Sequence, residues 1–295
     1  MERLHLPDNI KVHYAALEKA NYAVAAHAMG LKYGLYTAFP FVYKRLFGEN
    51  AWPLIKMKYM DDACVEMPFF INHNMRHTIQ DSGLYSLLFG VHKDKGTKEF
   101  VYKWYDELIR FTNDHAQDVV CVEVDAQAII GVEETWVLRE RMRNELPRNR
   151  IMNVFHIEDG IEGLDRLVEY SDYIAIGSGA IPWNVQSVKS VVKYIKQKNS
   201  DIDVHLLGCS DLNIMHSVRH LCTSCDSTSW LAPNRFGEIE NYHVSDISID
   251  NVKKRFGVGV WNEMRAYMGD KLTASTIVTS QICKDRYTKY CGNQN

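Results

Sequence analysis

Short apolar runs recur along the chain, and most of them end in a small or polar residue and lead into a longer segment of helical period. Near-continuous apolar runs of this kind are typical of parallel strands that are covered on both faces. Seven runs predict strands: residues 32–38, 77–83, 118–125, 150–157, 172–179, 203–210 and 221–228. A weaker eighth run lies within residues 63–71.

Segments of helical period separate the later strands. They are residues 97–115, 133–146, 162–170, 184–198 and 211–220. The alternation predicts an α/β fold, a TIM-like (β/α)8 barrel, and a doubly wound open sheet is the structural alternative. We expect one domain over residues 1–295, with the barrel core at 30–230 and a C-terminal extension at 231–295. Within that extension, 231–248 reads as a loop or hairpin and 249–268 as a helix that would close the barrel.

Composition and charge place the chain in the ordinary globular range. Hydrophobic residues make up 46% and charged residues 24% of 295 residues, and the formal net charge is −3. A strongly basic surface for nucleic acid is therefore not indicated, although local patches can exist on a neutral protein. We expect a cytoplasmic protein without a membrane partner, because no apolar run reaches transmembrane length and no signal peptide is recognised at the start.

Polar residues at the predicted strand ends are the candidates for chemistry, because functional side chains of such barrels lie where the strands end. They are Asp81, Asp125, His156, Asp159, Ser178, Cys209 and Asp226. The set is rich in carboxylates, so it suits a polar neutral heterocycle and a developing positive charge better than a phosphate. Two carboxylates across a sugar can act as nucleophile and as general acid/base. Strand-end aspartates also cap helices, so one pair alone is a weak signal.

Five segments, in order, resemble the motifs of the tRNA-guanine transglycosylases. They are "QDSGLYS" (80–86), "VEVDAQ" (122–127), "VFHIEDG" (154–160), "YIAIGSGAIP" (173–182) and "CDSTSW" (225–230). The first and last are most similar to those of the 7-deazaguanine DNA transglycosylases, a branch found in bacteriophages and in bacterial DNA-modification clusters. For a phage protein, the expected location is the host cytoplasm.

The resemblance implies a role for each matching residue. Asp226 would be the nucleophile and Asp81 the general acid/base, while Tyr85 would stack on the base and Asp125 would accept hydrogen bonds from it. The implied base-binding positions are Ser82, Gly83, Tyr85, Asp125, His156, Asp159, Gly177, Ser178 and Gly179.

Two departures from the family pattern bear on the substrate. Asp159 stands where the family has a glutamine, and an ionised carboxylate can only accept hydrogen bonds; His156 nearby replaces a glycine. The C-x-C-x2-C zinc motif that follows the nucleophile in the tRNA enzymes is missing after Asp226. We therefore predict no metal site, no zinc subdomain and DNA rather than RNA as the polymer.

The resemblance thus implies a pentosyltransferase that replaces guanine in DNA with a 7-deazaguanine base such as preQ0, through a covalent aspartyl-glycosyl intermediate. No cofactor is expected, and the partners are DNA and the free base. Three alternatives remain: a tRNA-type enzyme with a reduced RNA-binding region, a non-catalytic homologue that serves as a partner subunit, and a barrel hydrolase that leaves an abasic site. Retention of both Asp81 and Asp226 argues against the non-catalytic homologue.

Overall fold

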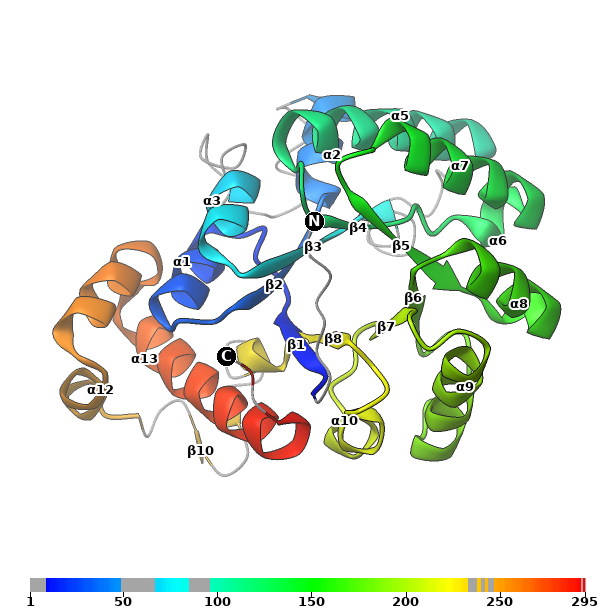
Figure 1. Cartoon of the computed structure of the whole chain (residues 1–295). Helices are drawn as coiled ribbons and strands as arrows, with labels where there is room; N and C mark the ends of the chain where they lie inside the picture. The colour runs from blue at the N-terminus through cyan, green and yellow to red at the C-terminus, as the bar shows by residue number, and fades with distance from the viewer. Residues whose placement is uncertain are drawn as a thin grey trace.

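Eight parallel strands form a closed barrel surrounded by helices (Figure 1). The computed structural model describes residues 9–48, 67–84, 96–232, 238–239, 242–243, 247–292 and 294. The strands are β1 (Lys11–Tyr14), β2 (Tyr33–Thr37), β3 (His77–Asp81), β4 (Val120–Val122), β5 (Arg150–Phe155), β6 (Tyr173–Ile176), β7 (Asp203–Leu206) and β8 (Ser224–Ser227). They follow one another in chain order around the barrel, and β8 pairs with β1 to close it. The predicted barrel is confirmed, and the open sheet is excluded.

All five predicted helices are present. The helices are α1 (Ala20–Ala28), α2 (Phe39–Phe47), α3 (Met67–Asn74), α5 (Lys98–His115), α6 (Gln127–Ile130), α7 (Val132–Glu145), α8 (Gly160–Tyr170), α9 (Val185–Lys198), α10 (Leu212–Val218), α12 (Ile249–Phe256) and α13 (Val258–Cys291). Several begin at side-chain caps that the sequence displays: Thr97 accepts from the Phe100 N–H and Asn184 from the Ser187 N–H. Such caps satisfy backbone donors that have no partner within the helix.

The eighth strand was predicted in the wrong place. Residues 67–71 of the weak run belong to α3, and residues 63–66 lie outside the described residues. The missing strand is β1, so the barrel begins at Lys11 rather than near residue 30. A short apolar run does not distinguish a strand from a buried helix. The four residues of β1 also carry Lys11 and His13, which break the apolar pattern.

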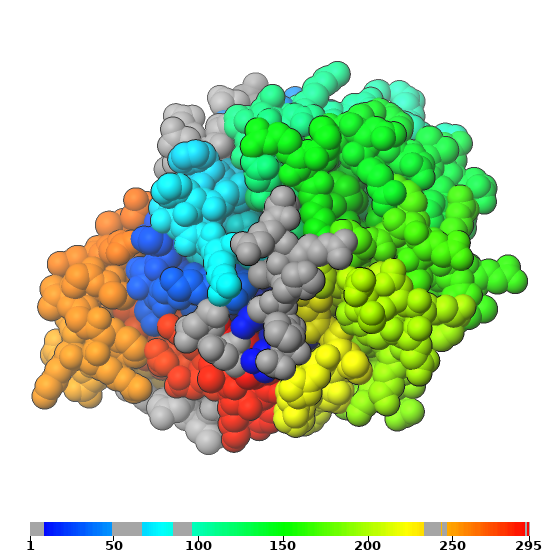
Figure 2. Space-filling view, viewed as in Figure 1, coloured from blue at the N-terminus to red at the C-terminus, as the bar shows by residue number. Residues whose placement is uncertain are grey.

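The C-terminal extension contains the predicted hairpin, formed by β9 (Glu238–Ile239) and β10 (Tyr242–His243). The helix predicted at 249–268 is instead divided at Gly257, and α13 then continues beyond a break at Gly269. Both glycines have positive φ, 89° and 72°, which helices do not accommodate. The part of α13 that follows the break packs on α1 and α10 and so fills the last position in the outer ring (Figure 2).

Two layers of apolar side chains hold the fold together. A small cluster inside the barrel includes Leu35, Ile79 and Val154, and a much larger one lies between the strands and the helices. This division follows from strand geometry, because alternate side chains point to opposite faces. Within the described residues, no helix has both the length and the apolar composition that a membrane span requires.

Candidate active site

Strand geometry brings Asp81 and Asp226 to the same end of the barrel. Asp81 is the last residue of β3 and shares a face with Ile79, which belongs to the interior cluster. Asp226 lies in β8, two residues after Ser224, and pairs with His13 of β1. Because side chains two residues apart share a face, both carboxylates point inward near the C-terminal ends of their strands.

Asp81 is surrounded by groups that act on its charge. Its carboxylate accepts the Gly83 N–H at 3.1 Å and a hydrogen bond from the hydroxyl of Thr37, its cross-strand partner on β2. Burial raises the pKa of Asp81 to about 6, the two hydrogen bonds oppose that rise, and the charges of Asp226 and Asp125 add to it. The three carboxylates are therefore close enough for their charges to interact, and both protonation states of Asp81 are accessible near neutral pH.

Asp226 is held through one oxygen and is only 9% exposed. Its Oδ1 accepts the Gly208 N–H at 2.7 Å and lies 3.1 Å from His205 Nε2. Within the described part of the chain, no donor contacts its Oδ2. A carboxylate fixed at one oxygen presents the other one in a defined direction, as a nucleophile requires.

Asp125 and His156 form a second contact near the same end. They follow β4 and β5, and His156 Nε2 lies 3.4 Å from Asp125 Oδ1. Burial raises the pKa of Asp125, and the neighbouring His156 opposes that rise. Asp125 is also close enough to Asp81 to affect its pKa. The structure thus brings this predicted pair into the neighbourhood of the two strand-end aspartates.

Asp159 has both of its oxygens engaged within the chain. Oδ1 accepts the Gln127 side-chain amide at 2.9 Å, and Oδ2 accepts the His156 N–H at 3.3 Å. These bonds cap the short 3-10 helix η5 (Ile157–Asp159) and tie it to α6. The carboxylate of Asp159, which can only accept hydrogen bonds, therefore holds η5 in place through both of its oxygens.

The turn after β3 owes its glycine to packing. Gly83 has φ +77°, and a Cβ there would lie 2.5 Å from the Phe39 backbone nitrogen at the start of α2. Ser82 is 3% exposed, and its carbonyl accepts the Trp104 indole N–H at 3.0 Å. Thus Gly83 is needed for the turn to pack against α2, while Tyr85 lies outside the described residues.

The turn after β6 is different, because it is open. Ser178 and Gly179 are exposed and Gly177 is half-buried. Neither glycine has positive φ, and a Cβ at Gly179 would meet nothing within 4 Å. No contact with the described residues therefore accounts for Gly179, and this exposed residue is accessible to a ligand.

Sequence reasoning missed His205 and Glu18. His205 was visible as a polar residue in an apolar strand, and it is 0% exposed inside the barrel. Glu18 carries no sequence signal, yet it is 6% exposed and its Oε2 lies 3.4 Å from the Thr37 N. Burial raises the pKa of Glu18, and the Asp81 charge adds to the effect. A fourth carboxylate thus belongs to the site.

Among the described residues, no group of three or more His, Cys, Asp or Glu side chains is arranged to hold a metal ion. Comparison with known proteins finds no matching family model and no similar curated protein.

Proposed function

We propose that this protein is a base-exchange transglycosylase that replaces guanine in DNA with a 7-deazaguanine base of the preQ0 type. One observation supports it above the others: Asp81 and Asp226 point inward at the same end of the barrel, and the Asp226 charge helps to raise the pKa of Asp81. Enzymes that break a glycosidic bond by double displacement commonly use two interacting carboxylates in different environments, one as nucleophile and one as general acid/base.

In the first half of the reaction, Asp226 attacks C1′ of the target nucleotide. The bond between C1′ and the base nitrogen breaks, its electron pair leaves with guanine, and protonated Asp81 donates a proton to the leaving base. A carboxyl with a pKa of about 6 carries enough of the acid form near neutral pH for this role.

In the second half, the incoming base attacks C1′ and transfers a proton to the Asp81 carboxylate. The C1′–oxygen bond breaks, and its electron pair returns to Asp226. The glycosyl ester keeps the sugar activated between the two displacements, so the exchange proceeds without another energy source. The enzyme and Asp81 return to their starting states.

We assign the selection of the base to the groups around Asp81 and Asp226. Asp125 would accept hydrogen bonds from the N1–H and exocyclic amine that guanine and preQ0 share, and the exposed main chain of Gly179 would contact the base edge. A base within a duplex must first leave the stack, at a cost on the order of a few kcal/mol. We therefore expect faster exchange at unpaired or easily opened guanines.

Guanine exchange gives a direct test, because the reaction can run with guanine as both leaving and incoming base. The protein is incubated with mixed-sequence duplex DNA or with tRNA, together with radiolabelled guanine or unlabelled preQ0. The proposal predicts label in DNA and, by nucleoside mass spectrometry, the deazaguanine nucleoside. Label in tRNA alone would favour the tRNA-type alternative. Release of guanine with no incorporation would indicate a hydrolase.

The two aspartates are distinguished by trapping the intermediate on a denaturing gel with labelled DNA. Asp226→Asn should form no adduct, because an amide lacks the attacking anionic oxygen. Asp81→Asn should slow exchange by about 10²- to 10⁴-fold and still form some adduct. The reverse pattern would exchange the two roles. A normal exchange rate in either variant would remove that residue from the mechanism.

A further inference from the structure

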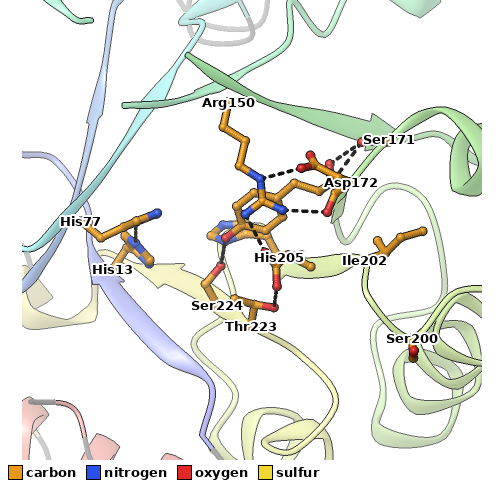
Figure 3. A network of polar contacts seen from close by, with 12 residues as sticks. His13, His77, Arg150, Ser171, Asp172, Ser200, Ile202, His205, Thr223 and Ser224 are labelled. Atoms are coloured by element: carbon orange, nitrogen blue, oxygen red, sulfur yellow. Dashed lines mark hydrogen bonds and ion pairs between the residues drawn. The ribbon is translucent and has the colours of Figure 1, made fainter. Parts of the chain in front are cut away.

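A continuous row of hydrogen bonds runs from Asp226 into the barrel interior. His205 Nε2 lies 3.1 Å from Asp226 Oδ1, and His205 Nδ1 lies 2.6 Å from Ser224 Oγ. Ser224 Oγ in turn bonds the Tyr173 hydroxyl. Figure 3 shows His205 and Ser224 facing each other within this network.

Strand register explains why the row is continuous. His205 on β7 and Ser224 on β8 are direct cross-strand partners, and Asp226 is two residues farther along β8 on the same face. Direct and diagonal neighbours on one face of a sheet are within side-chain reach. The imidazole therefore spans from Ser224 to Asp226, with one ring nitrogen for each.

The direction of these bonds follows from what each group can donate. Burial raises the pKa of Tyr173, so its phenol keeps its proton and can donate to Ser224 Oγ. The Ser224 hydroxyl then donates to His205 Nδ1, and the proton on Nε2 points at the Asp226 carboxylate, which can only accept. This assignment gives each hydrogen bond in the row one donor and one acceptor. The opposite order would set a nitrogen lone pair against a carboxylate oxygen.

We propose that His205 is a positioning residue for Asp226, and this inference rests on the proposed function. His205 and the Gly208 N–H hold Oδ1 from two directions, which leaves Oδ2 as the oxygen that attacks C1′. Ser224 and Tyr173 fix the imidazole in turn. Arg150 is stacked 4.6 Å from the Tyr173 ring centroid and is itself paired with Asp203 and Asp172, so the far end of the row is anchored.

A pair of substitutions separates positioning from simple filling of space. In His205→Leu the donor to Asp226 is lost, whereas in His205→Gln a side-chain amide can still donate to it. We expect the Leu variant to lower kcat for guanine exchange into DNA by about 10²-fold, the scale for a misplaced reacting group, with KM for DNA nearly unchanged. The Gln variant should recover about tenfold or more of that loss.

His77→Gln is the matched control. His77 is also a buried barrel histidine, but its Nδ1 contacts His13 Nε2 at 2.8 Å. In Figure 3 no dashed line joins His13 or His77 to His205, and the nearer of the two rings, that of His13, meets the His205 ring edge-on with 6.1 Å between centroids. The control should keep the wild-type rates of exchange and of adduct formation. If His205→Leu does not fold, Ser224→Ala replaces it, with an expected fall in kcat of about tenfold because the imidazole loses its support.

The outcomes identify which conclusion fails. A wild-type kcat in His205→Leu, or equal loss in the Leu and Gln variants, would overturn the positioning role while leaving the transglycosylase in place. Equal loss of kcat in His77→Gln would also overturn it, since any barrel histidine would then have the same effect. Absence of exchange and adduct in the wild-type protein would overturn the proposed function and this inference together.

Discussion

Asp81 sits among three other carboxylates, those of Glu18, Asp125 and Asp226. Its pKa of about 6 in the folded protein lies above its ordinary value of 3.8. A raised pKa means that the folded state binds this proton more tightly than the unfolded state. The resulting stabilisation is present below pH 3.8 and is lost as the pH rises through 6. The ionised Asp81 needed to accept a proton is therefore the less stable form of the fold.

Asp81→Asn should accordingly stabilise the protein while it impairs exchange. The amide oxygen can still accept the Gly83 N–H, and the buried negative charge is removed. We expect a gain of about 1 kcal/mol in the free energy of unfolding at pH 8. Urea unfolding at pH 8 and pH 5 measures it, and the gain should shrink at pH 5, where wild-type Asp81 is largely protonated. A loss of stability that is equal at both pH values would contradict this account.

At the scale of elements, strand parity places the chemistry and the turns shape it. Asp81 and Asp226 face inward because Ile79 and Ser224, two residues earlier on each strand, do so. The turn after β3 is closely packed because Gly83 lies against the start of α2, whereas the turn after β6 is open. Two glycine-containing turns that look alike in sequence therefore have different physical requirements.

Alanine substitutions test that difference. Gly83→Ala combines a positive φ with a clash against the Phe39 backbone, so we expect a loss of about 3 kcal/mol in the free energy of unfolding. Gly179→Ala is the control, with an expected change within about 0.5 kcal/mol because its added methyl group would meet none of the described residues within 4 Å. Chemical denaturation of both variants gives the comparison. A Gly83→Ala protein as stable as the control would mean that α2 moves aside without cost.

At the scale of the whole molecule, the barrel interior contains several buried polar side chains. His13 and His77 are buried together inside it, and burial is the main cause of a lowered pKa in each. The pKa of His77 falls from 6.5 to about 3. Both histidines are therefore neutral in the folded protein near neutral pH, and protonation favours the unfolded chain.

Stability should fall on acidification as a result. The unfolded chain protonates His77 below pH 6.5 and the folded chain does so only at about pH 3, so stability declines across that range. Asp81 acts in the opposite sense between its ordinary pKa of 3.8 and about 6, which partly offsets the decline. Unfolding free energies measured from pH 7 to pH 4 should show a shallower slope for His77→Gln. An unchanged slope would indicate that His77 is not the titrating group.

Local pattern by itself was enough to predict much of this molecule. It identified seven of the eight barrel strands and five helices, because a strand buried on both faces and an amphipathic helix each produce a recognisable pattern of apolar residues within one segment. It also placed Asp81 and Asp226 at strand ends. Their roles came from the resemblance of ordered motifs and stay predictions until exchange is measured.

Tertiary structure decided what depends on contacts between distant segments. The first strand, β1, is too short and polar to be recognised alone, and its pairing with β2 and β8 defines it. Which helix closes the ring depends on how the second part of α13 packs against α1 and α10. The bond from His205 to Asp226 likewise exists because β7 and β8 meet in one register. The hydrophobic period and composition of a segment reflect the environment of that segment alone. The register of the strands and the closure of the barrel depend instead on interactions between segments that lie far apart in the chain.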